Sequence, residues 1–150
     1  MKARNLGLLA SFGSVLLIAG AWGFEYLGYA PCRMCYWQRW PHYIAIALGA
    51  AILIRPHVTW YMLGSLATFV TAAVGVFHSG VEKKWWDGPS SCTGGGLGGQ
   101  SGAELLSTSG NLLIMCDEVS WSFIGISMAS WNALFSFGLT LIWIAAAKRA

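Results

Sequence analysis

Two cysteines, Cys32 and Cys35, stand two residues apart in the stretch Ala30-Pro-Cys-Arg-Met-Cys-Tyr-Trp-Gln-Arg39. Thiols at this spacing can close a small, reactive disulfide, and the neighbouring Arg33 and Arg39 favour the thiolate that carries out exchange. The same spacing is also the first half of many zinc sites. The rest of the sequence has to decide between these two kinds of chemistry.

The composition indicates a membrane protein. Of the 150 residues, 56% are hydrophobic and only 10% are charged, and the mean hydropathy is +0.57. A soluble domain carries about 25% charged residues, so this chain has too little polar surface to enclose a water-soluble core of its size. The formal charge of +3 is small and dispersed, so the sequence has no basic patch that would indicate nucleic-acid binding.

Four apolar runs predict an all-α membrane protein, a single integral-membrane domain built as a bundle of four transmembrane helices. We expect the spans at residues 6–26, 40–54, 58–77 and 121–147. The alternative for the first run is a cleaved signal peptide, because Ala19-Gly-Ala21 has the small residues of a cleavage site. The run continues to Tyr26, beyond the usual h-region of about 7–15 residues, which favours a spanning helix.

The second apolar run is short, and it needs another turn from the cysteine segment or a thinned bilayer in order to span. Pro41 complicates this helix, because proline suits a first turn but costs a backbone hydrogen bond farther in. We therefore expect Cys32 and Cys35 at, or just outside, the beginning of the second helix.

Two polar loops connect the spans on one side of the membrane, at about residues 27–39 and 78–120. The second loop contains a glycine-rich run at 94–102, a predicted short helix at 103–106 and an apolar stretch at 111–115 that suits the membrane surface. So many glycines predict a flexible strap.

The distribution of basic residues predicts the orientation. Four spans place both termini and Arg55 on one side, which then holds five basic residues: Lys2, Arg4, Arg55, Lys148 and Arg149. The other side holds four, namely Arg33, Arg39, Lys83 and Lys84, together with all six acids. The positive-inside rule favours cytoplasmic termini. All four cysteines then face outward, where disulfides persist.

Four cysteines allow three pairings, and the sequence spacing leaves these open. Cys92 and Cys116 lie far apart, so the second half of a zinc site is missing and we expect no metal. Purely structural disulfides are the plainer alternative, but a Cys-x-x-Cys bridge closes so short a loop that it stabilises little. A local pair beside the membrane and a mobile pair in the long loop can instead pass oxidising equivalents by thiol–disulfide exchange.

A dithiol that is oxidised at the bilayer surface needs a two-electron acceptor, and a lipid-soluble quinone is available at that depth. Arg39 lies one helical turn beyond Cys35, where its guanidinium would favour the Cys35 thiolate and a quinone oxygen that gains negative charge. The alternative for Arg39 is an arginine that snorkels to the interface. His78, at the end of the third run, approaches the same headgroup or is an ordinary interfacial histidine.

Two motifs carry a resemblance to a known family. The stretch Pro31-Cys32-Arg-Met-Cys35-Tyr-Trp-Gln-Arg39 resembles the first outward loop of the disulfide bond formation protein B (DsbB) family. Cys116-Asp117, followed by Trp121-Ser-Phe123-Ile-Gly125-Ile-Ser-Met128-Ala-Ser-Trp131, resembles the entry into the fourth helix of that family. The resemblance extends over the whole chain, with the close cysteine pair before the distant pair.

The resemblance implies an enzyme of the bacterial inner membrane, a thiol:quinone oxidoreductase that reoxidises a DsbA-like periplasmic thiol oxidase. It implies a Cys92–Cys116 disulfide that the reduced partner attacks at Cys92. Cys116 then exchanges with Cys32, and Cys35 is released as a thiolate. Both termini would be cytoplasmic and both cysteine loops periplasmic.

The resemblance also implies a site for ubiquinone or menaquinone that is lined by Arg39, His78 and Met128. The second loop is richer in glycine than in better-known members, so neither its structure nor the identity of the partner that docks on it is carried over. A vitamin K epoxide reductase-like enzyme is the nearest alternative, but its loop cysteines precede the Cys-x-x-Cys pair. The alternative from another class is a non-enzymatic membrane scaffold braced by disulfides.

Overall fold

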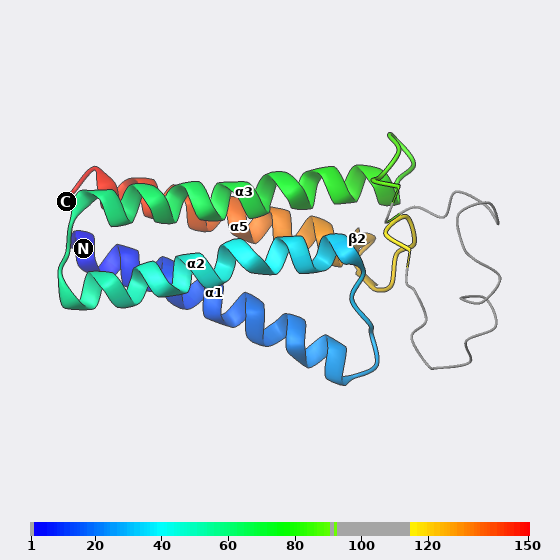
Figure 1. The fold of residues 1–150 in the computed structure, drawn as a ribbon, viewed down its shortest axis with the longest axis horizontal. Coiled ribbons are helices and arrows are strands. Elements are labelled where there is room, and N and C mark those ends of the chain that lie inside the picture. The colour runs from blue at the N-terminus through cyan, green and yellow to red at the C-terminus, as the bar shows by residue number, and fades with distance from the viewer. Residues whose placement is uncertain (1, 91, 93–114) are drawn as a thin grey trace.

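The computed structural model describes residues 2–90, 92 and 115–150, and in this part of the chain four long helices form a bundle (Figure 1). The elements are α1 (Ala3–Tyr26), α2 (Arg33–Ile54), α3 (Val58–Glu82), the short strands β1 (Ser122–Phe123) and β2 (Ile126–Ser127), and α5 (Met128–Ala147). The predicted glycine-rich run at 94–102, the helix at 103–106 and residues 111–114 of the apolar stretch lie outside the described residues.

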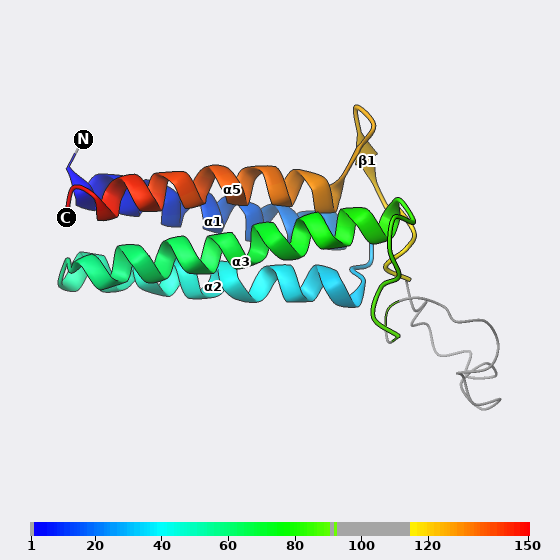
Figure 2. The ribbon, with the colours of Figure 1, turned by 90° about the horizontal axis from the view of Figure 1, so that it is seen from above.

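Each helix packs against two neighbours, in the order α1, α2, α3, α5 and back to α1. The interface between α3 and α5 is the most extensive, whereas α1 and α3 barely touch across the bundle. Both chain ends lie at one end of the bundle, and the α1–α2 connection and the hairpin lie at the other (Figure 2). Helix α1 diverges from the other helices towards Tyr26 (Figure 1).

Small residues let these helices approach closely, as is common where helices associate in lipid. A Cβ atom on Gly64 of α3 would lie 2.6 Å from the ring of Trp143 in α5, and one on Gly75 would lie 3.0 Å from Ala133. Trp143 and Tyr61 are almost fully buried in the part of the core that lies near both chain termini. Large apolar side chains such as Phe12 are instead exposed on the outside, where a bilayer would cover them.

Among the described helices, α1, α3 and α5 are long and apolar enough to cross a membrane. Helix α2 has a similar length, but it carries Gln38, Arg39 and His42 within its first half. The structure therefore supports three of the four predicted spans by length and composition alone.

Helix α2 begins seven residues before the predicted span, at Arg33 instead of Trp40. Cys32 caps it, and its sulfur accepts a hydrogen bond from the backbone N–H of Cys35 at 3.3 Å. Pro41 consequently lies inside the helix, where it has no N–H to offer the carbonyl of the preceding turn. The two cysteines occupy the first turn of α2.

Helix α5 begins at Met128, so the predicted bounds of the fourth span, 121–147, were too wide at their N-terminal end. The residues before it form an antiparallel hairpin in which Ser122 pairs with Ser127. The central residues Ile124 and Gly125 both have positive φ, at 54° and 73°, as a two-residue hairpin turn requires and a helix does not allow. Ser127 then caps α5 by accepting a hydrogen bond from the N–H of Ser130 at 3.3 Å.

The close contact at Gly64 gives a test of the α3–α5 interface. We expect Gly64→Ala to lower the free energy of unfolding by about 1–3 kcal/mol, because the added methyl group overlaps the rigid, buried ring of Trp143. Gly138→Ala in α5 is the matched control, since nothing lies within 4 Å of its Cβ position. Unfolding of the purified protein in mixed micelles with increasing SDS measures both variants, and equal stability of the two would contradict this packing.

Candidate active site

The structure brings the two cysteine pairs together at one end of the bundle. Cys92 and Cys116 form a disulfide, whereas Cys32 and Cys35 are free thiols with their sulfur atoms 2.9 Å apart. Cys32, Cys92 and Cys116 are all buried and belong to one cluster, against which Cys35 packs. Disulfide exchange needs one sulfur to reach another, and this cluster places both pairs in the same buried region.

Contacts between the loop and α3 hold this arrangement. The N–H of Cys116 donates to the carbonyl of Cys92 at 2.7 Å, so the disulfide partners are also joined through their backbones. Asp117 forms an ion pair with Lys84, just beyond the end of α3, and the Lys84 ammonium holds the pKa of the Asp117 carboxyl below its usual range. The segment that carries Cys116 is thereby held against the C-terminal end of α3.

The contacts in the reduced pair favour a thiolate at Cys32. The hydrogen bond from the Cys35 side chain, assisted by His78 and the Cys35 N–H and opposed by burial, lowers the pKa of Cys32 to about 5. Cys32 also caps α2, where the helix dipole favours negative charge. The sequence had pointed to the Cys35 thiolate, but the hydrogen bonds that stabilise a negative charge converge on Cys32.

His78 faces the thiols directly. Helix α3 continues to Glu82, beyond the predicted end of the span at Phe77, so His78 lies within a regular helix. Its side chain is buried, with Nε2 3.5 Å from the Cys32 sulfur and Nδ1 2.9 Å from Nε2 of Gln38. This histidine therefore contacts the redox pair and is not an interfacial residue turned towards solvent.

Arg39 is also buried, and its partner was not predicted from the sequence. Its guanidinium donates to the Glu25 carboxylate at 2.8 Å and to the carbonyl of Ala21 at 3.4 Å. It also lies 5.0 Å from the ring centroid of Tyr36, within the range of a cation–π interaction. The ion pair joins α1 to α2, and the signal for it was an acidic residue at the end of an apolar run.

A cavity of about 410 Å³ is lined by residues of α1, α2, α3 and α5, at the end where α1 diverges. Its lining includes Cys35, Arg39, His78 and Met128, so the predicted quinone-site residues border the same space as the redox pair. Most of the remaining lining is apolar, including Phe24. Apolar walls with a few convergent polar groups are typical of sites for small organic ligands.

Cys32, Cys35 and His78 form the one group in the described part of the chain with three closely placed metal-ligating atoms, all within 4.8 Å of one another. A structural zinc ion takes four protein ligands. With one ligand fewer than such a site requires, these residues are better suited to thiol chemistry, and the absence of a metal stays a prediction.

Sequence reasoning missed three polar residues beside the site, of which Gln38 and His42 are buried and Asn132 is half-buried. Gln38 donates to His78, Asn132 donates to Gln38 at 2.8 Å, and His42 lies 3.2 Å from Asn132. Asn132 lies in an apolar run predicted to cross the membrane, and polar residues in such runs are rare enough to mark a functional or tightly paired position. That signal was present in the sequence.

Comparison with known proteins agrees with this geometry. The family model described as "Disulfide bond formation protein DsbB" matches residues 3–146. The chain belongs to the DsbB family. It is 31% identical over 144 residues to disulfide bond formation protein B of Hahella chejuensis (strain KCTC 2396), covering 85% of this chain and 86% of that relative. It is 26% identical over 136 residues to the protein of that name from Acidovorax sp. (strain JS42), covering 86% and 78%.

No solved structure gave a significant match. The resemblance read from the sequence is confirmed, and membership of the DsbB family supports a membrane protein that forms disulfide bonds. Together with the three apolar helices, it supports a multi-pass membrane protein.

The low pKa of Cys32 predicts an unusual pH profile for the reduced DsbB-family protein. We expect the reaction of Cys32 with a small methylating reagent to be constant above about pH 6 and to fall as the pH drops through 5, because the thiolate is then protonated. Peptide mapping by mass spectrometry, with the loop disulfide intact, measures this rate. His78→Asn should move the midpoint upward, whereas His57→Asn, at an exposed position with its hydrogen bond to Thr59, should not. A rate that rises through pH 8 in the native protein, as for an ordinary thiol, would contradict the assignment.

Proposed function

We propose that this protein is a thiol:quinone oxidoreductase that reoxidises a DsbA-like periplasmic thiol oxidase and passes the electrons to a membrane quinone, ubiquinone or menaquinone. One observation carries the proposal. The free pair Cys32 and Cys35 lies in the same buried cluster as the Cys92–Cys116 disulfide and borders an apolar cavity. A pair placed in this way can take electrons from a soluble protein and release them to a lipid-soluble acceptor.

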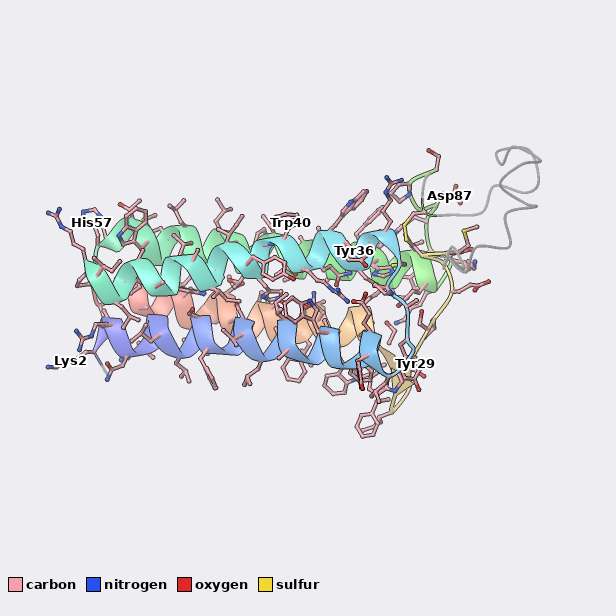
Figure 3. The ribbon with its side chains drawn as sticks, turned by 60° about the horizontal axis from the view of Figure 1, so that its bottom comes forward. Lys2, Tyr29, Tyr36, Trp40, His57 and Asp87 are labelled. Carbon is pink, nitrogen blue, oxygen red and sulfur yellow. A yellow bond between two sulfur atoms is a disulfide. The ribbon has the colours of Figure 1, made fainter. Side chains whose placement is uncertain are left out.

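The proposed topology has four spans in the bacterial inner membrane, with cytoplasmic termini and periplasmic cysteine loops. Helix α2 packs between α1 and α3 and is nearly as long as they are, so it would share their depth in the bilayer. Lys2 and His57 lie at one end of the bundle, whereas Tyr29 and Asp87 lie at the other, the end of the cysteine cluster (Figure 3). The basic residues at the ends of the chain favour the cytoplasm for the first end.

The thiol steps balance in electrons and protons. The two thiols of the partner become a disulfide as they reduce Cys92–Cys116, with Cys92 as the proposed point of attack. The thiols of Cys92 and Cys116 then reduce a Cys32–Cys35 disulfide, beginning with attack of Cys116 on Cys32 and release of Cys35. Each exchange moves two electrons and two protons. A closed loop pair beside an open Cys32 and Cys35, as in this structure, is the state that follows both exchanges.

The residues around the cavity fit a quinone. Its apolar lining suits an aromatic ring, and Arg39 supplies donors for a ring oxygen. His78 borders the same space beside the redox pair, and Met128 contributes a flexible apolar wall. A bound quinone would supply an acceptor for two electrons and two protons. Cys32 and Cys35 would release these as their disulfide re-forms. Because Glu25 neutralises Arg39, the guanidinium is held in the apolar site as a hydrogen-bond donor without a net local charge.

The two cysteine pairs have separable roles, which variants distinguish. We expect Cys92→Ala to stop oxidation of a DsbA-like partner, while the chemically reduced variant still consumes a water-soluble quinone through Cys32 and Cys35. Cys35→Ser should abolish quinone consumption with either electron source. Quinone absorbance and thiol trapping of the partner measure the two activities. Quinone consumption that survives Cys35→Ser would overturn the assignment, and a native protein that oxidises no partner thiol would fit a disulfide-braced scaffold.

Arg39 should act on the quinone and not on the thiol partner. We expect Arg39→Met to raise the apparent KM for quinone by about tenfold or more, since it removes a buried charged donor, and to leave the reaction of Cys92–Cys116 with the partner unchanged. Arg33→Met is the matched control, because Arg33 lies on the same helix with an exposed side chain. Steady-state kinetics over a range of quinone concentrations gives both values. Equal quinone kinetics in the two variants would remove Arg39 from the site.

A further inference from the structure

A line of hydrogen bonds, buried near Cys32 and partly buried at Asn132, extends from the redox pair into the bundle. It runs from the Cys32 sulfur through His78, Gln38 and Asn132 to His42, with contacts of 3.5, 2.9, 2.8 and 3.2 Å. These residues lie at the beginning of α2, within it, and on α3 and α5, and His42 also contacts Ser14 of α1 at 3.1 Å. The line therefore connects all four helices.

The direction of these hydrogen bonds follows from one backbone carbonyl. Nε2 of Gln38 lies 3.2 Å from the carbonyl oxygen of Met34, which only accepts, so this atom has to be the amide nitrogen. Its second hydrogen points to Nδ1 of His78 at 2.9 Å. Nδ1 is therefore the acceptor, and in a neutral imidazole the proton sits on Nε2, which faces the Cys32 sulfur.

The orientation of Gln38 is held in turn from α5. Its Oε1 accepts from Nδ2 of Asn132 at 2.8 Å, and the second Nδ2 hydrogen goes to the hydroxyl of Thr71 at 3.1 Å. That hydroxyl donates to the Gln38 carbonyl at 2.8 Å. Oδ1 of Asn132 faces Nε2 of His42, which donates to it. A flip of either amide would place two donors or two acceptors opposite each other, so the line has one self-consistent direction, towards Cys32.

We propose that Gln38 and Asn132 are positioning residues that hold His78 as a neutral imidazole with its Nε2 proton directed at the Cys32 sulfur. The inference deepens the proposed function and rests on it for its purpose. The Glu82 carboxylate and the backbone carbonyl of Cys116 also face the His78 ring. Glu82 lies 3.9 Å from Nε2, which is too far for a hydrogen bond to oxygen, while the Cys32 sulfur at 3.5 Å is within reach. The amides therefore direct the donor to the thiol.

The role of the line is orientation and not proton supply. Oxidation of Cys32 and Cys35 releases two protons, the number that reduction of a quinone to a quinol consumes, so the proposed reaction balances without protons from the bundle interior. What the reaction needs is a thiolate at Cys32 when that sulfur attacks to re-form the disulfide. A fixed N–H donor favours this anion in every turnover.

Nitrogen NMR of the protein labelled with ¹⁵N-histidine tests the proposal, because it reports the tautomer without partner or quinone. The chain has three histidines, and loss of signals in His78→Asn identifies those of His78. In the native protein with reduced Cys32 and Cys35 at neutral pH, we expect protonated Nε2 and unprotonated Nδ1. The opposite tautomer, or a ring protonated on both nitrogens, would overturn the proposal.

Variants separate positioning from general packing. Gln38→Leu and Asn132→Leu should give mixed tautomers and reduce the fraction of Cys32 thiolate at pH 5 by severalfold to about tenfold, measured by the pH dependence of methylation. Gln38→Glu should protonate Nδ1, because a carboxylate accepts where the amide donated. Thr140→Val is the control, since it breaks another buried α3–α5 hydrogen bond, to Thr68 at 3.0 Å, and should leave both readouts unchanged.

The two proposals can fail separately. If His78 shows the expected tautomer but Cys35→Ser still consumes quinone, the proposed function is wrong and the positioning is right. If the Leu variants do not fold, the native spectrum and Gln38→Glu decide. A Gln38→Glu protein whose His78 signals equal those of the native protein would contradict the role of Gln38.

Discussion

A polar side chain inside this bundle has to find its partners within the protein, because the lipid around a membrane bundle offers none. Among the described residues, the Trp143 indole nitrogen is the one buried side-chain nitrogen or oxygen without a hydrogen-bond partner. Several of the other buried polar groups are paired across helices, as Thr140 with Thr68 and Ser79 with Ser130. This requirement fixes the register of the helices more narrowly than apolar packing would, since a shift of one residue breaks several pairs at once.

The register of the helices determines where the reactive thiols and His78 lie. The beginning of α2 lies against the C-terminal end of α3, so the sulfur that caps one helix contacts an imidazole on the last turns of the other. The dipole of α2, the contact with Cys35 and the contact with His78 all favour a thiolate at Cys32. The Cys92–Cys116 disulfide belongs to the same buried cluster as Cys32. Thiolate stabilisation and access to a second disulfide thus arise from the same packing.

Helix α1 contributes differently. It diverges from α2 towards Tyr26, and the cavity lies where it does so (Figure 1). The Arg39–Glu25 ion pair bridges the two helices at that place, so the divergence does not leave a buried charge unpaired. An apolar cavity open between helices and bordered by the redox pair is the arrangement through which a lipid-soluble molecule can approach thiols that face away from water.

The sequence by itself determined the class of protein and its helical character, and it predicted the thiol chemistry of the close cysteine pair, because length, hydropathy and the Cys-x-x-Cys spacing are local properties. It also identified the family, since the motifs at Pro31 to Arg39 and Cys116 to Trp131 can be recognised from the sequence without the three-dimensional structure. The bounds of α2 and α5 were less accurate, because a cysteine cap and a hairpin with two positive φ angles override hydrophobic runs.

Only the tertiary structure decided which groups meet. Glu25 pairs with Arg39, and Gln38 and Asn132 direct His78, through contacts between residues 14 to 94 positions apart. It also showed that contacts from His78 and the Cys35 N–H, which favour a thiolate, converge on Cys32, whereas the charge of Arg39 alone had suggested Cys35. Such contacts depend on how helices rotate and slide against one another, and helical periodicity in a uniformly apolar sequence leaves that rotation undetermined.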